Sequence, residues 1–140
     1  MRTLILLACS AAFASAAPVP KELKKDELAR FEGVWWEMRC NDTDSSDLNG
    51  SRQFSFNRDG SAGIHSKAGA APSQYKFALD STTTPRSFTW VPTRGGIEYN
   101  AIYKFDGDRL AIVFTNSNKP RPIEVRPGAG DVYYELVRVK

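Results

Sequence analysis

Few side chains in this sequence could carry out chemistry on a substrate. His65 is the only histidine, and apart from Cys9, near the N-terminus, Cys40 is the only thiol. One histidine and one thiol provide neither a metal-binding cluster nor an evident catalytic triad. Asp106 and Asp108 form a close pair of carboxylates, but they fall in a turn, where solvation and turn chemistry explain both. The sequence therefore predicts no catalytic residue, no metal site and no cofactor, and it disfavours an enzyme.

Aromatic residues are more informative. Many of them recur at every second position inside short apolar segments, which places their side chains on one face of a strand. Such residues form either a filled core or the wall of a pocket for an apolar ligand. The pocket-lining candidates are Trp35, Phe54, Phe56, Tyr75, Phe77, Phe88, Trp90, Tyr99, Tyr103 and Phe114.

Eight candidate strands must position these aromatic side chains. Turn signals separate the strands, among them Asp106-Gly107-Asp108, where glycine can adopt the positive φ of a tight turn. The alternation is clearest from Ile97 to Phe105, where every second residue is apolar or aromatic. The short, even spacing predicts an all-β fold, an antiparallel up-and-down barrel without exposed edges. The strands are expected at 33–40, 52–58, 61–66, 74–79, 86–91, 97–105, 109–115 and 132–139.

A short helix is expected over residues 21–30, ahead of the first strand. Its few large apolar residues allow only a narrow stripe to dock on the barrel. The first strand then carries two adjacent tryptophans. Strict alternation places Trp36 on one face and Trp35 on the other, together with Glu37 and Arg39. If Trp35 points inward, the two charged residues follow it unless a bulge intervenes, and burying them is costly even as a pair.

The N-terminus has the layout of a signal peptide. Arg2 precedes an apolar run that is too short to span a bilayer, and Ala14-Ser15-Ala16 gives the small-x-small pattern of a cleavage site. We predict a signal peptide at 1–16, a spacer at 17–20 and one domain at 21–140. The mature chain would then be secreted or periplasmic and would have no transmembrane segment. The alternative is a lipoprotein anchored through Cys9, because residues 6–9 resemble a lipoprotein processing box.

The charge distribution bears on the class of binding partner, and the cysteine content bears on disulfide bonding. The formal net charge is +3, and acidic and basic residues are interspersed. This distribution argues against nucleic acid or an anionic membrane as the main partner. After cleavage Cys40 has no partner for an internal disulfide. We interpret it as a half-buried strand residue, with an intermolecular disulfide or a reactive thiol as the alternatives.

Gly33-Val34-Trp35 directly after a short helix resembles the Gly-x-Trp signature in the first strand of lipocalins. More widely, the chain from residue 27 to 140 resembles a family of small exported bacterial proteins of planctomycetes that are lipocalin-like and have no assigned function. The resemblance implies an eight-stranded lipocalin-like (calycin-like) barrel with Gly33 at the chain entry, Trp35 plugging one end and Arg138 stacked on the indole. The residues that carry it are Leu28, Gly33, Trp35, Phe54-Ser55-Phe56, 75–80, Pro85, 102–110, Arg121-Pro122 and 136–140.

Two hypotheses for function follow. The first is a non-catalytic exported protein that binds a small apolar or amphipathic ligand inside its barrel, with a void open toward the polar loop 41–50. The second is an envelope-associated module with a filled barrel, whose loops bind a protein or a glycan. It would expose an apolar patch around Trp36 and Met38. The fold does not choose between them.

Overall fold

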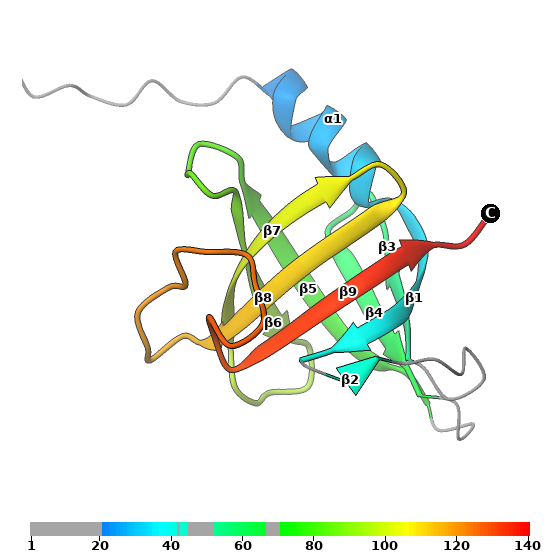
Figure 1. The fold of residues 1–140 in the computed structure, drawn as a ribbon. Coiled ribbons are helices and arrows are strands. Elements are labelled where there is room, and N and C mark those ends of the chain that lie inside the picture. The colour runs from blue at the N-terminus through cyan, green and yellow to red at the C-terminus, as the bar shows by residue number, and fades with distance from the viewer. Residues whose placement is uncertain (1–20, 42, 45–51, 67–70) are drawn as a thin grey trace, which may run out of the picture.

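The computed structural model describes residues 21–41, 43–44, 52–66 and 71–140, and it is a closed antiparallel β-barrel with one helix (Figure 1). The predicted signal peptide, the spacer, Cys9 and most of the loop 41–50 lie outside the described residues. The elements are α1 (Lys21–Phe31), β1 (Gly33–Cys40), β2 (Thr43–Asp44), β3 (Gln53–Phe56), β4 (Ser61–His65), β5 (Ser73–Asp80), β6 (Ser87–Pro92), β7 (Tyr99–Asp106), β8 (Arg109–Asn116) and β9 (Val132–Arg138).

Strands that follow one another in the chain pair side by side from β3 to β9, and β1 pairs with both β3 and β9. The pairing of β1 with β9 closes the barrel, so the eight strands leave no long open edge. The two-residue strand β2 pairs only with the end of β1. The structure thus confirms the predicted all-β class, the antiparallel eight-stranded barrel and the short helix before its first strand. None of the described helices is long and apolar enough to span a membrane.

An irregularity in β1 decides which of its side chains face inward. Trp35 is fully buried and Glu37 is only 6 % exposed, whereas Trp36 is half-buried. The pairing of β1 with β9 shifts register between Glu37 and Arg39, which is a β-bulge. A bulge inserts one extra residue and redirects the strand, so Arg39 no longer has to follow Glu37 into the barrel. Only one of the two charged residues is therefore buried.

Two hydrophobic clusters hold the fold together. The larger one fills the barrel and contains most of the aromatic residues. The smaller one lies on its outer face, where Ile102, Val113 and Tyr133 are covered by Val125 and Ala129 of the segment between β8 and β9. This segment approaches closely at Gly130, where a Cβ would lie 2.6 Å from the Cγ1 of Val113. A long connection thus becomes a second layer over one side of the barrel.

The expected strand over 97–105 begins later than predicted. It starts at Tyr99, and Ile97 is 53 % exposed instead of sharing the buried face. Gly95 and Gly96 have φ values of +78° and +133°, and an irregular stretch follows the turn as far as Glu98. Alternation alone could not show where this turn ends, because Ile97 and Tyr99 have the spacing of one strand face.

Candidate functional site

Helix α1 lies across one end of the barrel (Figure 1), and its C-terminal residue, Phe31, fills that end with an aromatic ring. The Phe31 side chain is fully buried. Its ring centroid lies 4.8–5.8 Å from those of five other aromatic rings, in tilted and edge-on arrangements that are favourable beyond area burial. These rings are Phe56, Phe77, Phe88, Tyr103 and Phe105. Side chains therefore fill this end of the interior.

The junction between α1 and β1 is stabilised by contacts of three residues, Gly33, Trp35 and Arg138. Gly33 has a φ of +126°, and a Cβ there would lie 3.0 Å from Nη1 of Arg138. Nε1 of the buried Trp35 donates a hydrogen bond to the carbonyl oxygen of Phe31 at 2.8 Å. The Arg138 guanidinium lies 4.3 Å from the Trp35 ring centroid and donates to two main-chain carbonyls at the end of α1. Each of these contacts stabilises the junction between helix and barrel.

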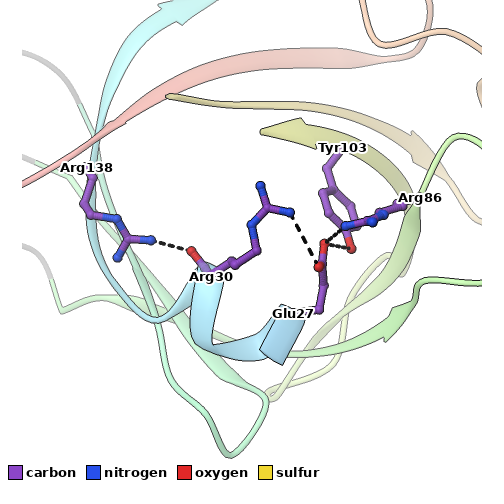
Figure 2. Close-up of polar contacts among 5 residues, drawn as sticks. All are labelled: Glu27, Arg30, Arg86, Tyr103 and Arg138. Atoms are coloured by element: carbon purple, nitrogen blue, oxygen red, sulfur yellow. Dashed lines mark hydrogen bonds and ion pairs between the residues drawn. The ribbon is translucent and has the colours of Figure 1, made fainter. Parts of the chain in front are cut away.

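A buried carboxylate ties α1 to the barrel wall, as Figure 2 shows. Oε1 of Glu27, a residue only 6 % exposed, accepts hydrogen bonds from Nη1 of Arg86 at 2.7 Å and from the hydroxyl of Tyr103 at 3.0 Å. Nη1 of Arg30 lies 3.7 Å from Oε2. Burial and the nearby carboxylate raise the pKa of Tyr103, so its hydroxyl stays protonated and can donate. The cluster satisfies a buried charge, and we assign it to helix docking.

The other end of the barrel contains a cavity of about 140 Å³. Six strands contribute to its wall, and all the lining side chains are aliphatic or aromatic. The rings of Tyr75 and Trp90 stack against each other with centroids 4.6 Å apart. A ligand that enters here meets a largely apolar surface. The lining residues are Ile64, Tyr75, Trp90, Tyr99, Phe114, Val132 and Tyr134.

The structure divides the ten predicted pocket-lining residues between two places. Four of them line the cavity: Tyr75, Trp90, Tyr99 and Phe114. The other six belong to the packed interior and are at most 5 % exposed: Trp35, Phe54, Phe56, Phe77, Phe88 and Tyr103. A filled core and an apolar cavity, the two alternatives drawn from the sequence, thus occur at opposite ends of one barrel.

A surface groove of about 420 Å³ adjoins the cavity. Tyr75 and Tyr99 line both the cavity and the groove, so the two spaces are neighbours. Pro72, Pro92 and Ile97 give the groove an apolar wall, and Arg94 adds a positive charge. The exposed position of Ile97, which differs from the prediction, places this side chain in the groove.

A polar cluster stands behind the cavity wall at Tyr134. The Arg52 guanidinium donates a hydrogen bond to the Tyr134 hydroxyl, and its central carbon lies 5.7 Å from the ring centroid. Nε of Arg52 also lies 3.8 Å from Oε2 of the buried Glu37. Regular alternation from the buried Trp35 places Glu37 on the inward face, and the bulge comes only after it. The cluster therefore holds a carboxylate, a guanidinium and a phenol beside an apolar cavity.

The surroundings keep the Tyr134 phenol and the nearby Cys40 thiol protonated, because the pKa of each is raised. Burial raises the pKa of Tyr134 to about 12, while Arg52 works in the opposite direction. Burial, and secondarily the Glu37 carboxylate, also raises the pKa of the Cys40 thiol. A nucleophilic cysteine needs a lowered pKa. The cluster can form hydrogen bonds to a ligand, but it does not activate the half-buried Cys40.

Tyr134, Ile64, Val132 and Arg52 were missed as site residues. The first three lie within predicted strands, and the alternation of Val132, Tyr134 and Leu136 indicates one inward face of the last strand. That signal could have identified Tyr134. Arg52 begins the predicted strand 52–58, but it carries no comparable pattern, because a single arginine at the end of a strand is usually a solvated residue.

Two further observations bear on the class of site. Among the residues that the structure describes, no group of three or more His, Cys, Asp or Glu side chains could hold a metal ion. Comparisons of the chain with protein-family models, curated proteins and solved structures found no match.

Proposed function

We propose that this protein binds a small amphipathic molecule at the open end of its barrel and does not transform it chemically. The observation that carries the proposal is the cavity of about 140 Å³, lined by aliphatic and aromatic residues and backed at Tyr134 by Arg52. Binding sites for small molecules combine an apolar lining with a few placed polar groups, and this end of the barrel has both.

The dimensions of the two spaces suggest how the ligand is held. An apolar cavity of about 150 Å³ is large enough for one benzene ring. The inner cavity therefore suits one ring or a short branched chain, and the groove of about 420 Å³ beyond Tyr75 and Tyr99 would take the rest of the molecule. We propose a ligand whose apolar end lies in the cavity against Trp90 and Phe114 while its remainder lies along the groove.

The polar end of such a ligand has two cationic partners available. Arg52 is 46 % exposed and can contact a ligand at the mouth, and Arg94 lines the groove. A guanidinium forms strong, directional hydrogen bonds with carboxylate and phosphate groups. Glu37 offsets part of the Arg52 charge and holds the guanidinium near the cavity. A neutral or singly acidic amphipathic ligand therefore fits better than a cation.

The second candidate is an envelope-associated module that binds a protein or a glycan. The packed interior around Phe31 favours it, since that half of the barrel leaves no space for a ligand. Ile123 is 81 % exposed on the segment between β8 and β9 and could contact a partner. The patch expected around Trp36 and Met38 is less open, because both side chains are half-buried.

Export remains part of the proposal. We propose that residues 1–16 are removed after Ala16, so that the mature chain acts outside the cytoplasm. N-terminal sequencing of the protein purified from its own host tests this directly. A mature chain that begins near Ala17 supports secretion. A chain that begins at a lipid-modified Cys9 shows the anchored alternative instead.

The decisive experiment looks for a natural ligand on the purified protein and on a variant whose cavity is filled by a larger side chain. Native mass spectrometry of the gently purified protein should show a small adduct that is lost on denaturation. Val132→Trp places a large ring in the cavity, and Val139→Trp adds the same ring at an exposed position outside it. The adduct should disappear from the first variant and persist in the second.

Indole serves as the probe if no adduct is recovered. In the ¹⁵N-labelled protein, the side-chain N–H signal of Trp90 should shift on titration with indole, while that of Trp35 should stay unchanged. A clean apo mass with no indole response would refute the carrier proposal and favour the interaction module.

A further inference from the structure

A second groove lies at the end of the barrel that α1 closes, away from the cavity. Its volume is about 740 Å³. It is bounded by the end of α1, the loop between β5 and β6, the end of β7 and the segment between β8 and β9. The lining residues are Arg30, Ser81, Thr83, Thr84, Pro85, Arg86, Tyr103, Lys104, Phe105, Glu124 and Val125.

Positive charge dominates this groove. Arg30, Arg86 and Lys104 line it, and the only carboxylate among the described lining residues is Glu124, which is already paired with Arg126 outside the lining. The buried Glu27 offsets one charge by contacting both Arg30 and Arg86. Four cationic side chains thus face two carboxylates, which leaves a local excess of about two positive charges.

The two arginines are fixed in place but keep donors for a ligand. Arg86 uses Nη1 for Glu27, and its side chain is still 48 % exposed. The Arg30 guanidinium lies 4.3 Å from the ring centroid of Phe105 and is 49 % exposed. Because both contact one carboxylate, the two guanidinium groups lie close together. Such preorganised groups lose little conformational entropy when they bind an anion.

Two more groups in the groove lack a partner. Lys104 is exposed on β7, and no acidic side chain in the described part of the chain pairs with it. The Ser81 hydroxyl oxygen is buried and has no hydrogen-bond partner among the described residues. Buried polar groups are nearly always satisfied, so an unsatisfied hydroxyl in a groove that three cationic side chains also line suggests that a ligand completes the site.

We propose that this groove binds a tetrahedral oxyanion, the phosphate or sulfate group of a small solute, through Arg30, Arg86 and Lys104. Guanidinium and ammonium groups that outnumber the carboxylates around them are a usual means of binding such groups, and here Glu27 compensates only part of the positive charge. The site is independent of the cavity at the open end, and either can be present without the other.

NMR titration of the ¹⁵N-labelled full chain tests the proposal at constant ionic strength, with chloride as the reference salt. The probes are inorganic phosphate, inorganic sulfate and glycerol 3-phosphate. Saturable shifts are expected at the amides around 81–86 and 104–105. Tighter binding of the ester indicates a phosphorylated solute, and tighter binding of an inorganic ion indicates the free anion.

Charge-removal variants show whether the groove is responsible. Lys104→Gln should weaken binding about tenfold, because it removes one charge-assisted contact. Lys76→Gln removes the same charge from an exposed position on β5 outside the groove and should leave binding within about twofold. Both side chains are exposed, so both variants should fold. No saturable shift with any probe, or equal weakening by the two variants, overturns the proposal.

Discussion

Replacing Arg138 by methionine should strongly destabilise the barrel, although the side chain is not fully buried. The guanidinium lies over the Trp35 ring at 4.3 Å and donates to the carbonyl oxygens of Arg30 and Glu32. The last carbonyls of a helix have no partner within it, so Arg138 supplies what α1 lacks at its C-terminus. Methionine keeps much of the apolar stem but removes the charge and every donor.

The expected loss can be worked out from these contacts. A hydrogen bond from a charged donor contributes about 1.5–3 kcal/mol, and a cation–π contact about 0.5–2 kcal/mol. Partial exposure favours the lower end of each range. We therefore expect the free energy of unfolding to fall by about 3 kcal/mol, with a Tm lower by about 10–15 °C for a domain of this size. Arg138→Lys keeps the charge but cannot reach both carbonyls while stacked, so about 1–2 kcal/mol should be lost.

Urea denaturation followed by far-UV circular dichroism measures the change, with equal m-values required for the comparison. Arg109→Met is the matched control, because this arginine is 63 % exposed and pairs with Glu135 on the barrel surface. This substitution should lower the free energy of unfolding by less than about 1 kcal/mol. If Arg138→Met costs no more than this control, water satisfies the helix carbonyls equally well, and the structural role assigned to Arg138 is wrong.

Three further predictions concern the same architecture. Gly33→Ala should lower the free energy of unfolding by about 2 kcal/mol or more in urea titrations, because φ is +126° and the new Cβ would meet Arg138 at 3.0 Å. Tyr103→Phe removes a donor from the buried Glu27 and should cost about 1–2 kcal/mol in the same assay, and an unchanged midpoint would contradict the helix-docking role. Stability should fall between pH 10 and about pH 12, because the raised pKa of Tyr134 means that the unfolded chain releases this proton first. Tyr134→Phe should show a shallower fall over that pH range, and an identical profile would count against the buried phenol.

Much of the fold could be predicted because each strand buries one face. The period-two pattern, interrupted by turn residues, located all eight barrel strands to within a few residues. The helix was predicted from its composition and extends one residue further, to Phe31. That one residue matters, because Phe31 is the ring that fills the closed end. Helix boundaries are set by capping contacts, and here the cap comes from Arg138 at the far end of the chain.

The candidate site was only partly predictable, for two physical reasons. Alternation identifies which residues face inward, but it does not show at which level of the barrel they lie. Phe88 and Trp90 are two residues apart on β6 and both belong to the buried core, yet only Trp90 also lines the cavity. Alternation from Trp35 places Glu37 inward, but Arg39 leaves that face at a bulge, and no residue type in β1 marks that bulge.

The two ends of the barrel separate stability from binding, and this separation gives the functional proposal its sharpest consequence. Phe31, Trp35 and Arg138 hold the closed end, whereas Trp90 and Tyr134 line the cavity at the other end. A substitution such as Val132→Trp should therefore abolish ligand binding with little loss of stability. Arg138→Met should lower stability while the remaining folded protein keeps its affinity, because the cavity wall is untouched. If the two properties instead fall together in both variants, the cavity belongs to the structural core, and the ligand site must be sought elsewhere.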